Sequence, residues 1–200
     1  MNESGEYRHR HAQGHDKSHR GGSSFRMHDP STVFGELKLK EGDLFLDLGC
    51  GPGDYAVYAS GLVGRSGTIY ALDKSESNIA ELTRRAREDC LGNIRAVVSD
   101  ITESLPVDDA CVDVCLVATV LHIPYVTTRA EELCVEISRV LKTDGRVAVI
   151  DCHKEYLPFG PPVHMRLSSE EVRDLMEQYG FGFLSEVDLG YNYLIQFTPQ

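Results

Sequence analysis

Residues 45–55 read FLDLGCGPGDY, and this stretch decides how the chain folds. It opens as an apolar run that carries Asp47 near its end. Three glycines then occupy every second position: Gly49, Gly51 and Gly53. Glycine loses more backbone freedom on folding than other residues, so such a run suits a place where the chain must turn tightly or a ligand must approach the backbone. Because a helical pattern follows over Tyr55–Val63, the stretch predicts a strand, a glycine-rich turn and a helix whose N-terminus can bind a ligand.

Beyond this stretch, β-rich runs alternate with helical patterns. Five runs are apolar enough to predict strands buried on both faces: Leu44–Leu48, Thr68–Asp73, Ile94–Ser99, Val112–Ala118 and Arg146–Asp151. The helices predicted between them are Tyr55–Val63, Ser77–Cys90 and Thr127–Leu141. Such an alternation predicts right-handed crossovers and a parallel sheet with helices on both faces.

The end of the chain has a different pattern. A predicted helix at Ser169–Tyr179 leads to β runs at Gly180–Val187 and Tyr191–Thr198, joined by a short link at Leu189-Gly190. Two strands with so short a link form a hairpin, so the last strand is antiparallel to its neighbour. The predicted fold class is therefore α/β, a Rossmann-like, doubly wound, seven-stranded mixed sheet with an antiparallel last strand.

The composition of the chain indicates where the protein is located and whether it contacts a membrane or a metal. The chain is 42% hydrophobic and 26% charged, as in ordinary soluble proteins, and no apolar run approaches the ~20 residues that span a bilayer. Its six cysteines form no CxxC pair and lie in apolar stretches, as small buried residues of a reducing compartment do. We therefore expect a cytoplasmic protein with no membrane partner and no metal site.

Residues 1–28 are predicted to be a disordered His/Arg/Gly-rich tail, and residues 29–200 the folded domain. The tail has a net charge of +2. Because the whole chain carries −11, the domain carries −13. An acidic domain repels phosphate backbones, so nucleic acid is not expected as a partner. Five of the eight histidines lie in the tail, and a metal-binding tail is the alternative to a solvated leader.

Three successive predicted strands carry an acid at or near their carboxyl ends: Asp47, Asp73 and Asp100. The carboxyl ends of neighbouring parallel strands share one ligand crevice. The glycine spacing is GxGxG, whereas a dinucleotide loop has GxGxxG, and Asp54 stands where its third glycine would be. A carboxylate repels a pyrophosphate but attracts an ammonium or a sulfonium. Asp73 suits ribose hydroxyls and Asp100 can accept from an exocyclic amine, although each acid could instead cap the helix that follows it.

These motifs, LDLGCGPG, IYALD and VVSD, resemble those of class I S-adenosylmethionine-dependent methyltransferases, nearest the ubiquinone/menaquinone-biosynthesis-like and type 11 groups. The resemblance covers about residues 29–198. It implies S-adenosyl-L-methionine as the cofactor, S-adenosyl-L-homocysteine as the product, and enzymatic methyl transfer. It also implies a set of cofactor-binding residues: Asp47, Gly49, Cys50, Gly51, Gly53, Asp73, Lys74, Asp100, Ile101 and Ala118.

Within that resemblance the residues have separate roles. The three glycines pass under the methionine part of the cofactor, with Asp47 near its amino group. Asp73 takes the ribose hydroxyls, and Lys74 borders the adenine. Asp100 and Ile101 hold the adenine edge.

The acceptor is predicted from the segment after the fourth strand. Residues 118–121 read ATVL, without the (Asn/Asp/Ser)-Pro-Pro-aromatic motif of the methyltransferases that act on DNA or on protein amide nitrogens. A small-molecule acceptor with a reacting carbon, oxygen or sulfur atom is therefore expected. A general base is needed only if the acceptor must lose a proton, and His122 and then His153 are the candidates. Residues 156–167, rich in proline and aromatics, are either a lid or a rigid connector.

Three other hypotheses stay open at this point. The chain could bind the cofactor without turnover, or use its cysteines as arsenite methyltransferases do. A nicotinamide-dependent oxidoreductase is disfavoured by the glycine spacing and by Asp47. The acceptor site could be open, or completed by the tail or by a second subunit, so a homodimer is left open as well.

Overall fold

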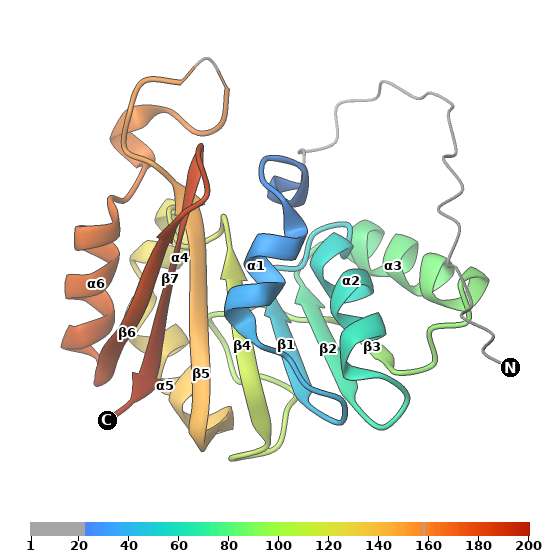
Figure 1. The fold of residues 1–200 in the computed structure, drawn as a ribbon. Helices are drawn as coiled ribbons and strands as arrows, with labels where there is room; N and C mark the ends of the chain where they lie inside the picture. Colours follow the sequence, from blue (N-terminus) through green and yellow to red (C-terminus); the bar gives the residue numbers. More distant parts are fainter. Residues whose placement is uncertain (1–22, 158) are drawn as a thin grey trace, which may run out of the picture.

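The structure is a computed structural model that describes residues 23–157 and 159–200. Seven strands form one sheet (Figure 1): β1 Leu44–Leu48, β2 Thr68–Asp73, β3 Ile94–Val98, β4 Val112–Ala118, β5 Leu141–Cys152, β6 Phe181–Asp188 and β7 Asn192–Pro199. Their order is β3-β2-β1-β4-β5-β7-β6. The first five strands are parallel, and β7 lies antiparallel between β5 and β6. The predicted fold class is confirmed, down to the antiparallel last strand.

Helices cover both faces of the sheet (Figure 1): α1 Pro30–Leu37, α2 Asp54–Val63, α3 Glu76–Glu88, α4 Pro124–Thr127, α5 Ala130–Val140 and α6 Ser169–Gln178. Buried residues of α1, α2 and α3 pack on one face, and those of α4, α5 and α6 on the other. The central strands are therefore apolar on both faces. In β4, for example, Val114 and Leu116 belong to one core and Cys115 and Val117 to the other.

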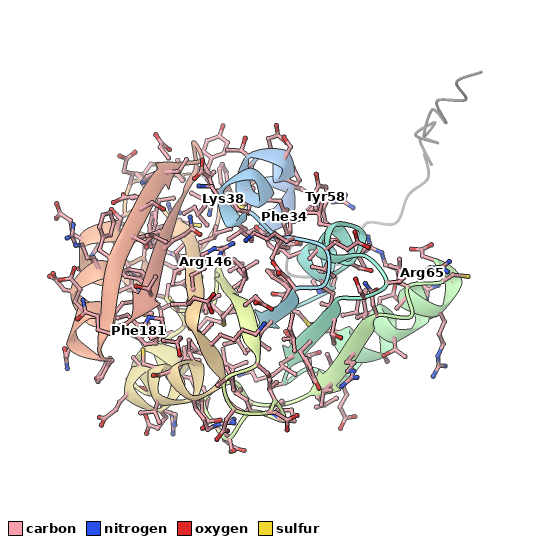
Figure 2. All side chains as sticks on the ribbon, turned by 60° about the horizontal axis from the view of Figure 1, so that its bottom comes forward. Phe34, Lys38, Tyr58, Arg65, Arg146 and Phe181 are labelled. Carbon is pink, nitrogen blue, oxygen red and sulfur yellow. The ribbon has the colours of Figure 1, made fainter. Side chains whose placement is uncertain are left out.

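Helix α1 was not predicted. Asp29 caps its first turn by accepting from the Ser31 amide at 2.9 Å, and Pro30 occupies the first helical position. Phe34 of α1 stacks on Tyr58 of α2 with ring centroids 4.6 Å apart, and the two lie together in Figure 2. The helix is short and follows the polar tail, so its hydrophobic pattern was too brief to predict a helix.

The segment before α1 also differs from expectation. Residues 24–26 form a short 3-10 helix, η1 Ser24–Arg26, within the range predicted to be a disordered tail. Ser24 is buried there. For residues 1–22, which lie outside the described part of the chain, the tail stays a prediction, and so does a metal-binding role for their histidines. Among the described residues, no helix combines the length and apolarity needed to cross a bilayer.

Candidate functional site

The glycine-rich turn joins β1 to α2 at the carboxyl edge of the sheet. All three of its glycines have positive φ: Gly49 at 72°, Gly51 at 52° and Gly53 at 80°. A Cβ on Gly53 would lie 2.4 Å from the Leu82 side chain, so this glycine lets α3 pack closely. A Cβ on Gly51 would meet nothing within 4 Å. A Cβ on Gly49 would lie 2.6 Å from the Val120 side chain, so this glycine also serves packing. Of the three, Gly51 is the one whose backbone faces open space.

That open space is a cavity of about 240 Å³. It is lined by the turn, by Asp47 and Asp73, by residues 118–120 after β4, and by Ser23 and Ser24. A second hollow of about 100 Å³ shares Gly49, Asp73 and Val120 with it and continues the cleft. Nine of the ten predicted cofactor-binding residues line one or both hollows, and Gly53 alone does not. The structure thus brings the residues of the three strand-end motifs into one cleft.

Asp47 is 1% exposed and lies at the bottom of the larger hollow. Within the described residues, its Oδ2 has no hydrogen-bond partner. Burial, with the charge of Asp73, raises the pKa of this carboxyl to about 8. A buried carboxylate oxygen without a donor is costly unless a ligand supplies one, and an ammonium group would do so.

Asp73 ties the glycine turn to the start of α3. Its Oδ2 accepts from the Gly51 amide at 2.8 Å, while its Oδ1 accepts from the Ser75 amide at 2.8 Å and from Asn78 Nδ2 at 3.3 Å. A carboxylate oxygen has two lone pairs, so Oδ2 keeps one acceptor position. Asp73 therefore orders the turn and can still accept from a ligand hydroxyl.

Tyr125 of α4, which sequence reasoning missed, is one of the residues that line the smaller hollow. Its hydroxyl donates to Asp100 Oδ2 at 3.0 Å. The cationic groups of Lys74 and Arg129 lie over its ring, at 5.1 and 4.1 Å from the centroid. Although burial acts to raise the pKa of Asp100, hydrogen bonds from Thr102 and Tyr125 hold it below the ordinary value. Asp100 is thus an anion at neutral pH, and the sequence contains no motif that would have paired Tyr125 with it.

The N-terminal segment forms another wall that the sequence did not reveal. The Ser24 hydroxyl lies 3.1 Å from the Tyr55 hydroxyl and 3.3 Å from Thr119 Oγ1. The Tyr55 hydroxyl also lies 2.9 Å from His28 Nε2, and burial lowers the pKa of His28. These bonds attach residues 24–28 to α2 and to the end of β4. Residues 24–28 read SFRMH, a stretch too short to show a helical or strand pattern, so the sequence did not reveal this packing.

The two predicted catalytic histidines lie in different surroundings. Nδ1 of His122 is 2.8 and 3.0 Å from the two carboxylate oxygens of the fully buried Asp151. Nε2 of His153 is 3.2 Å from Oδ1 of Asp188, whose side chain is 77% exposed. Neither ring lines the two hollows, but His122 follows Val120, which lines both. His153 lies beside the β6–β7 turn, where a surface role suits it.

The segment between β5 and α6 is anchored by Arg166, which is 2% exposed. Its guanidinium donates to four backbone carbonyls, those of His153, Glu155, Phe159 and Pro161. Phe159 also packs edge-on against Tyr191, with ring centroids 4.9 Å apart. These bonds support a rigid connector rather than a lid for the described part of this segment.

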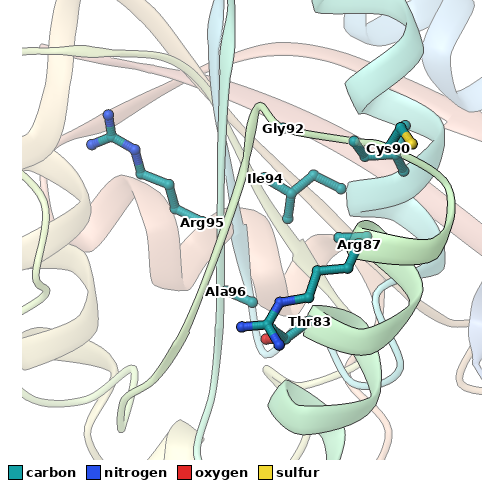
Figure 3. A pocket seen from close by; sticks show the side chains of 9 residues that line it. Thr83, Arg87, Cys90, Gly92, Ile94, Arg95 and Ala96 are labelled. Atoms are coloured by element: carbon teal, nitrogen blue, oxygen red, sulfur yellow. The ribbon is translucent and has the colours of Figure 1, made fainter.

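A further hollow of about 450 Å³ lies between α3 and β3 (Figure 3). Arg87 and Arg95 both line it, but Arg95 extends to the other side of the strand from Arg87 in Figure 3 and donates to the Tyr70 hydroxyl at 2.7 Å. The two cations do not converge on one point. This hollow is larger than the cleft at the glycine turn, yet it contains none of the three strand-end acids.

Strand order, the antiparallel β7 and a glycine turn flanked by strand-end acids together define the class I methyltransferase fold. A family model described as "Methyltransferase domain" matches residues 39–190. The chain belongs to this family, as the sequence motifs indicated.

Individual relatives agree with that assignment. A demethylmenaquinone methyltransferase from Lactobacillus johnsonii is 31% identical over 168 residues, which are 84% of this chain and 65% of the relative. A probable cobalt-precorrin-6B C(15)-methyltransferase (decarboxylating) from Saccharolobus solfataricus is 53% identical over 53 residues, 26% of each protein. The chain thus spans less than two thirds of the length of either relative. The crystal structure of a SAM-dependent methyltransferase from Aquifex aeolicus superposes with a TM-score of 0.81 at 29% identity, over 88% of this chain and 93% of that one.

Proposed function

We propose that the protein is an enzyme that binds S-adenosyl-L-methionine at the carboxyl ends of β1, β2 and β3 and transfers its methyl group to a small-molecule acceptor. The observation that carries this proposal is the buried Oδ2 of Asp47, which has no hydrogen-bond partner among the described residues and lines the same cavity as Gly51. When bound, the cofactor supplies a methyl group on a sulfonium. Such a transfer needs chiefly a dry pocket and correct positioning from the protein.

The residues present fit this cofactor. Asp47 would accept from its ammonium group, and the remaining acceptor position of Asp73 Oδ2 would take a ribose hydroxyl. Asp100, held as an anion, would accept from the adenine amine beside Lys74 and Tyr125. A pyrophosphate would instead lie against the Asp73 carboxylate, which repels it. This contrast favours a sulfonium cofactor over a dinucleotide.

A small acceptor is supported by the relatives. Those that cover most of this chain include proteins named for methyl transfer to demethylmenaquinone and to 2-phytyl-1,4-naphtoquinone. Their names place an aromatic ring compound at the acceptor site of those proteins. We extend to this chain only the class, a small organic acceptor.

The cysteine-based alternative finds little support in the structure. All six cysteines are free, but burial raises the pKa of Cys134 to about 12 and that of its neighbour Cys115 well above the ordinary value. A metalloid is held by thiolates, and these two groups stay protonated at neutral pH. The cofactor-binding module without turnover stays the alternative to an enzyme, and detection of methyl transfer separates the two.

Calorimetric titration with S-adenosyl-L-homocysteine and with NAD⁺ tests the proposal. We expect binding of the first and none of the second. Asp73→Asn should weaken binding, whereas Asp144→Asn, an exposed acid within β5 and away from the cleft, should not. Binding of NAD⁺ in place of S-adenosyl-L-homocysteine would refute the proposal. A cytoplasmic location, a homodimer and the exclusion of nucleic acid stay predictions of the sequence.

A further inference from the structure

His122 and Asp151 form a close pair at the carboxyl ends of β4 and β5. Both carboxylate oxygens of Asp151 lie within 3.0 Å of Nδ1 of His122, and the backbone amide of His122 donates to Oδ2 at 3.3 Å. Asp151 also accepts from the Cys152 amide at 2.8 Å and is completely buried. Its carboxylate therefore has a fixed orientation toward the imidazole ring.

The other ring nitrogen of His122 is free. Among the described residues, no hydrogen bond involves Nε2, and the side chain is 10% exposed. A carboxylate at Nδ1 favours the tautomer that carries its proton there, which leaves the lone pair on Nε2. The ring is thus oriented with an unoccupied proton acceptor at its outer end.

The pair adjoins the cleft. Ala118, Thr119 and Val120 line it, and His122 is two residues further along the chain. On the neighbouring strand, Ile150 pairs with Ala118 and accepts from the Thr119 amide at 2.7 Å. Asp151 is the next residue of β5. His122 is therefore two residues from Val120 in the cleft wall. Asp151 follows Ile150, which pairs with Ala118 of the same wall.

We propose that His122 is the general base of the reaction, that Asp151 is its positioning residue, and that the reacting atom of the acceptor carries a proton that must leave. This inference rests on the proposed function and deepens it. The acceptor atom forms a bond to the methyl carbon, the carbon–sulfur bond breaks with its electron pair left on sulfur, and the acceptor proton moves to Nε2 of His122. The positive charge passes from the sulfonium to an imidazolium beside the Asp151 carboxylate.

A structural role is the competing explanation, because the same bonds tie the β4–α4 loop to β5. The ring tautomer distinguishes the two in the wild-type protein saturated with S-adenosyl-L-homocysteine. ¹⁵N nuclear magnetic resonance of histidine-labelled protein should show His122 with Nδ1 protonated and Nε2 unprotonated. Asp151→Asn should alter this signature. A proton on Nε2 in the wild type would overturn the proposal without any knowledge of the acceptor.

Kinetics provides the second measurement, with 1,4-naphthohydroquinone and catechol as probes. A general base contributes about 10²- to 10⁴-fold, so His122→Ala should lower kcat by that factor while KM and the affinity for S-adenosyl-L-homocysteine change little. Added imidazole should restore part of the rate. Asp151→Asn should lower kcat without rescue by imidazole. His164→Ala, at an exposed histidine between β5 and α6, is the matched control and should leave kcat unchanged.

The outcomes separate this inference from the proposed function. If His122→Ala keeps the wild-type kcat while its melting temperature falls, the pair is structural and the inference is wrong. Transfer to nicotinamide, whose ring nitrogen has no proton to lose, but not to either probe would refute the acceptor class alone. Failure to bind S-adenosyl-L-homocysteine would refute the proposed function instead.

Discussion

The buried carboxyl of Asp47 is suited to binding a ligand but lowers the stability of the ligand-free protein. An unsatisfied buried polar group costs about 1–3 kcal/mol, and Oδ2 of Asp47 is such a group. The chain reduces this cost by holding a proton, since burial raises the pKa to about 8. At a pH between 3.8, the ordinary pKa, and about 8, the pKa in the folded protein, Asp47 is protonated in the folded protein and ionised in the unfolded chain. Stability from this group is therefore greatest at low pH and falls as pH rises through that window.

A cationic ligand requires the opposite state of Asp47. The affinity for S-adenosyl-L-homocysteine should therefore increase by up to about tenfold per pH unit from pH 6 to 8, with release of about one proton on binding. Titration calorimetry in buffers of different ionisation enthalpy counts that proton. Asp47→Asn should bind weakly at every pH and release none. An affinity independent of pH in the wild type would show that Asp47 does not meet the ammonium group.

Gly51 allows a second test at the level of one residue. Its Cβ would meet nothing within 4 Å in the described part of the chain, so Gly51→Ala should cost only the left-handed backbone strain of about 1–2 kcal/mol. Because the methyl group would enter the cleft, affinity for S-adenosyl-L-homocysteine should fall about tenfold or more. Gly180→Ala is the matched control, with φ at 84° and open space beside it. Equal affinities for the two variants would contradict the placement of the ligand against Gly51.

Among the elements, the 3-10 helix η1 has the least expected role. It contributes a wall of the cleft through Ser24, and the Tyr55 hydroxyl joins it to α2. One hydrogen bond contributes about 1 kcal/mol, so Tyr55→Phe should weaken binding of S-adenosyl-L-homocysteine about fivefold. Tyr58→Phe on the same helix is the control. The change keeps the ring, which contacts Phe34 and Phe25, and removes a hydroxyl that makes no hydrogen bond among the described residues. Titration calorimetry measures the affinity of both variants. An unchanged affinity in Tyr55→Phe would show that η1 does not contribute to the binding site.

For the whole molecule, cofactor binding should appear as thermal stability. A ligand present at 100 times its Kd stabilises the folded state by about 2.7 kcal/mol. In a protein of 200 residues, each kcal/mol corresponds to about 2–4 °C, so S-adenosyl-L-homocysteine should raise Tm by about 5–10 °C. Scanning calorimetry measures the shift, with NAD⁺ at the same concentration as the control. A Tm shift with NAD⁺ alone would indicate that the glycine turn binds a dinucleotide.

The strands, the parallel direction of the first five and the meeting of three acids at one edge were all predicted from the sequence. Continuous apolar runs, glycine spacing and acids at strand ends are local features, and local features predict secondary structure and turn chemistry directly. The carboxyl ends of parallel strands meet at one edge, so Asp47, Asp73 and Asp100 could be assigned to one site before the structure was known. Nine of the ten cofactor-binding candidates line the cleft for that reason.

Contacts between residues far apart in the chain could not be predicted in this way. The contacts between Tyr125 and Asp100, between His122 and Asp151, and between Ser24 and Thr119 join residues 25, 29 and 95 positions apart. Such contacts depend on the order of the strands and on how each loop packs over the edge of the sheet. No periodicity within a window of residues specifies them, because their energy comes from burial and hydrogen bonds that exist only once the sheet has formed.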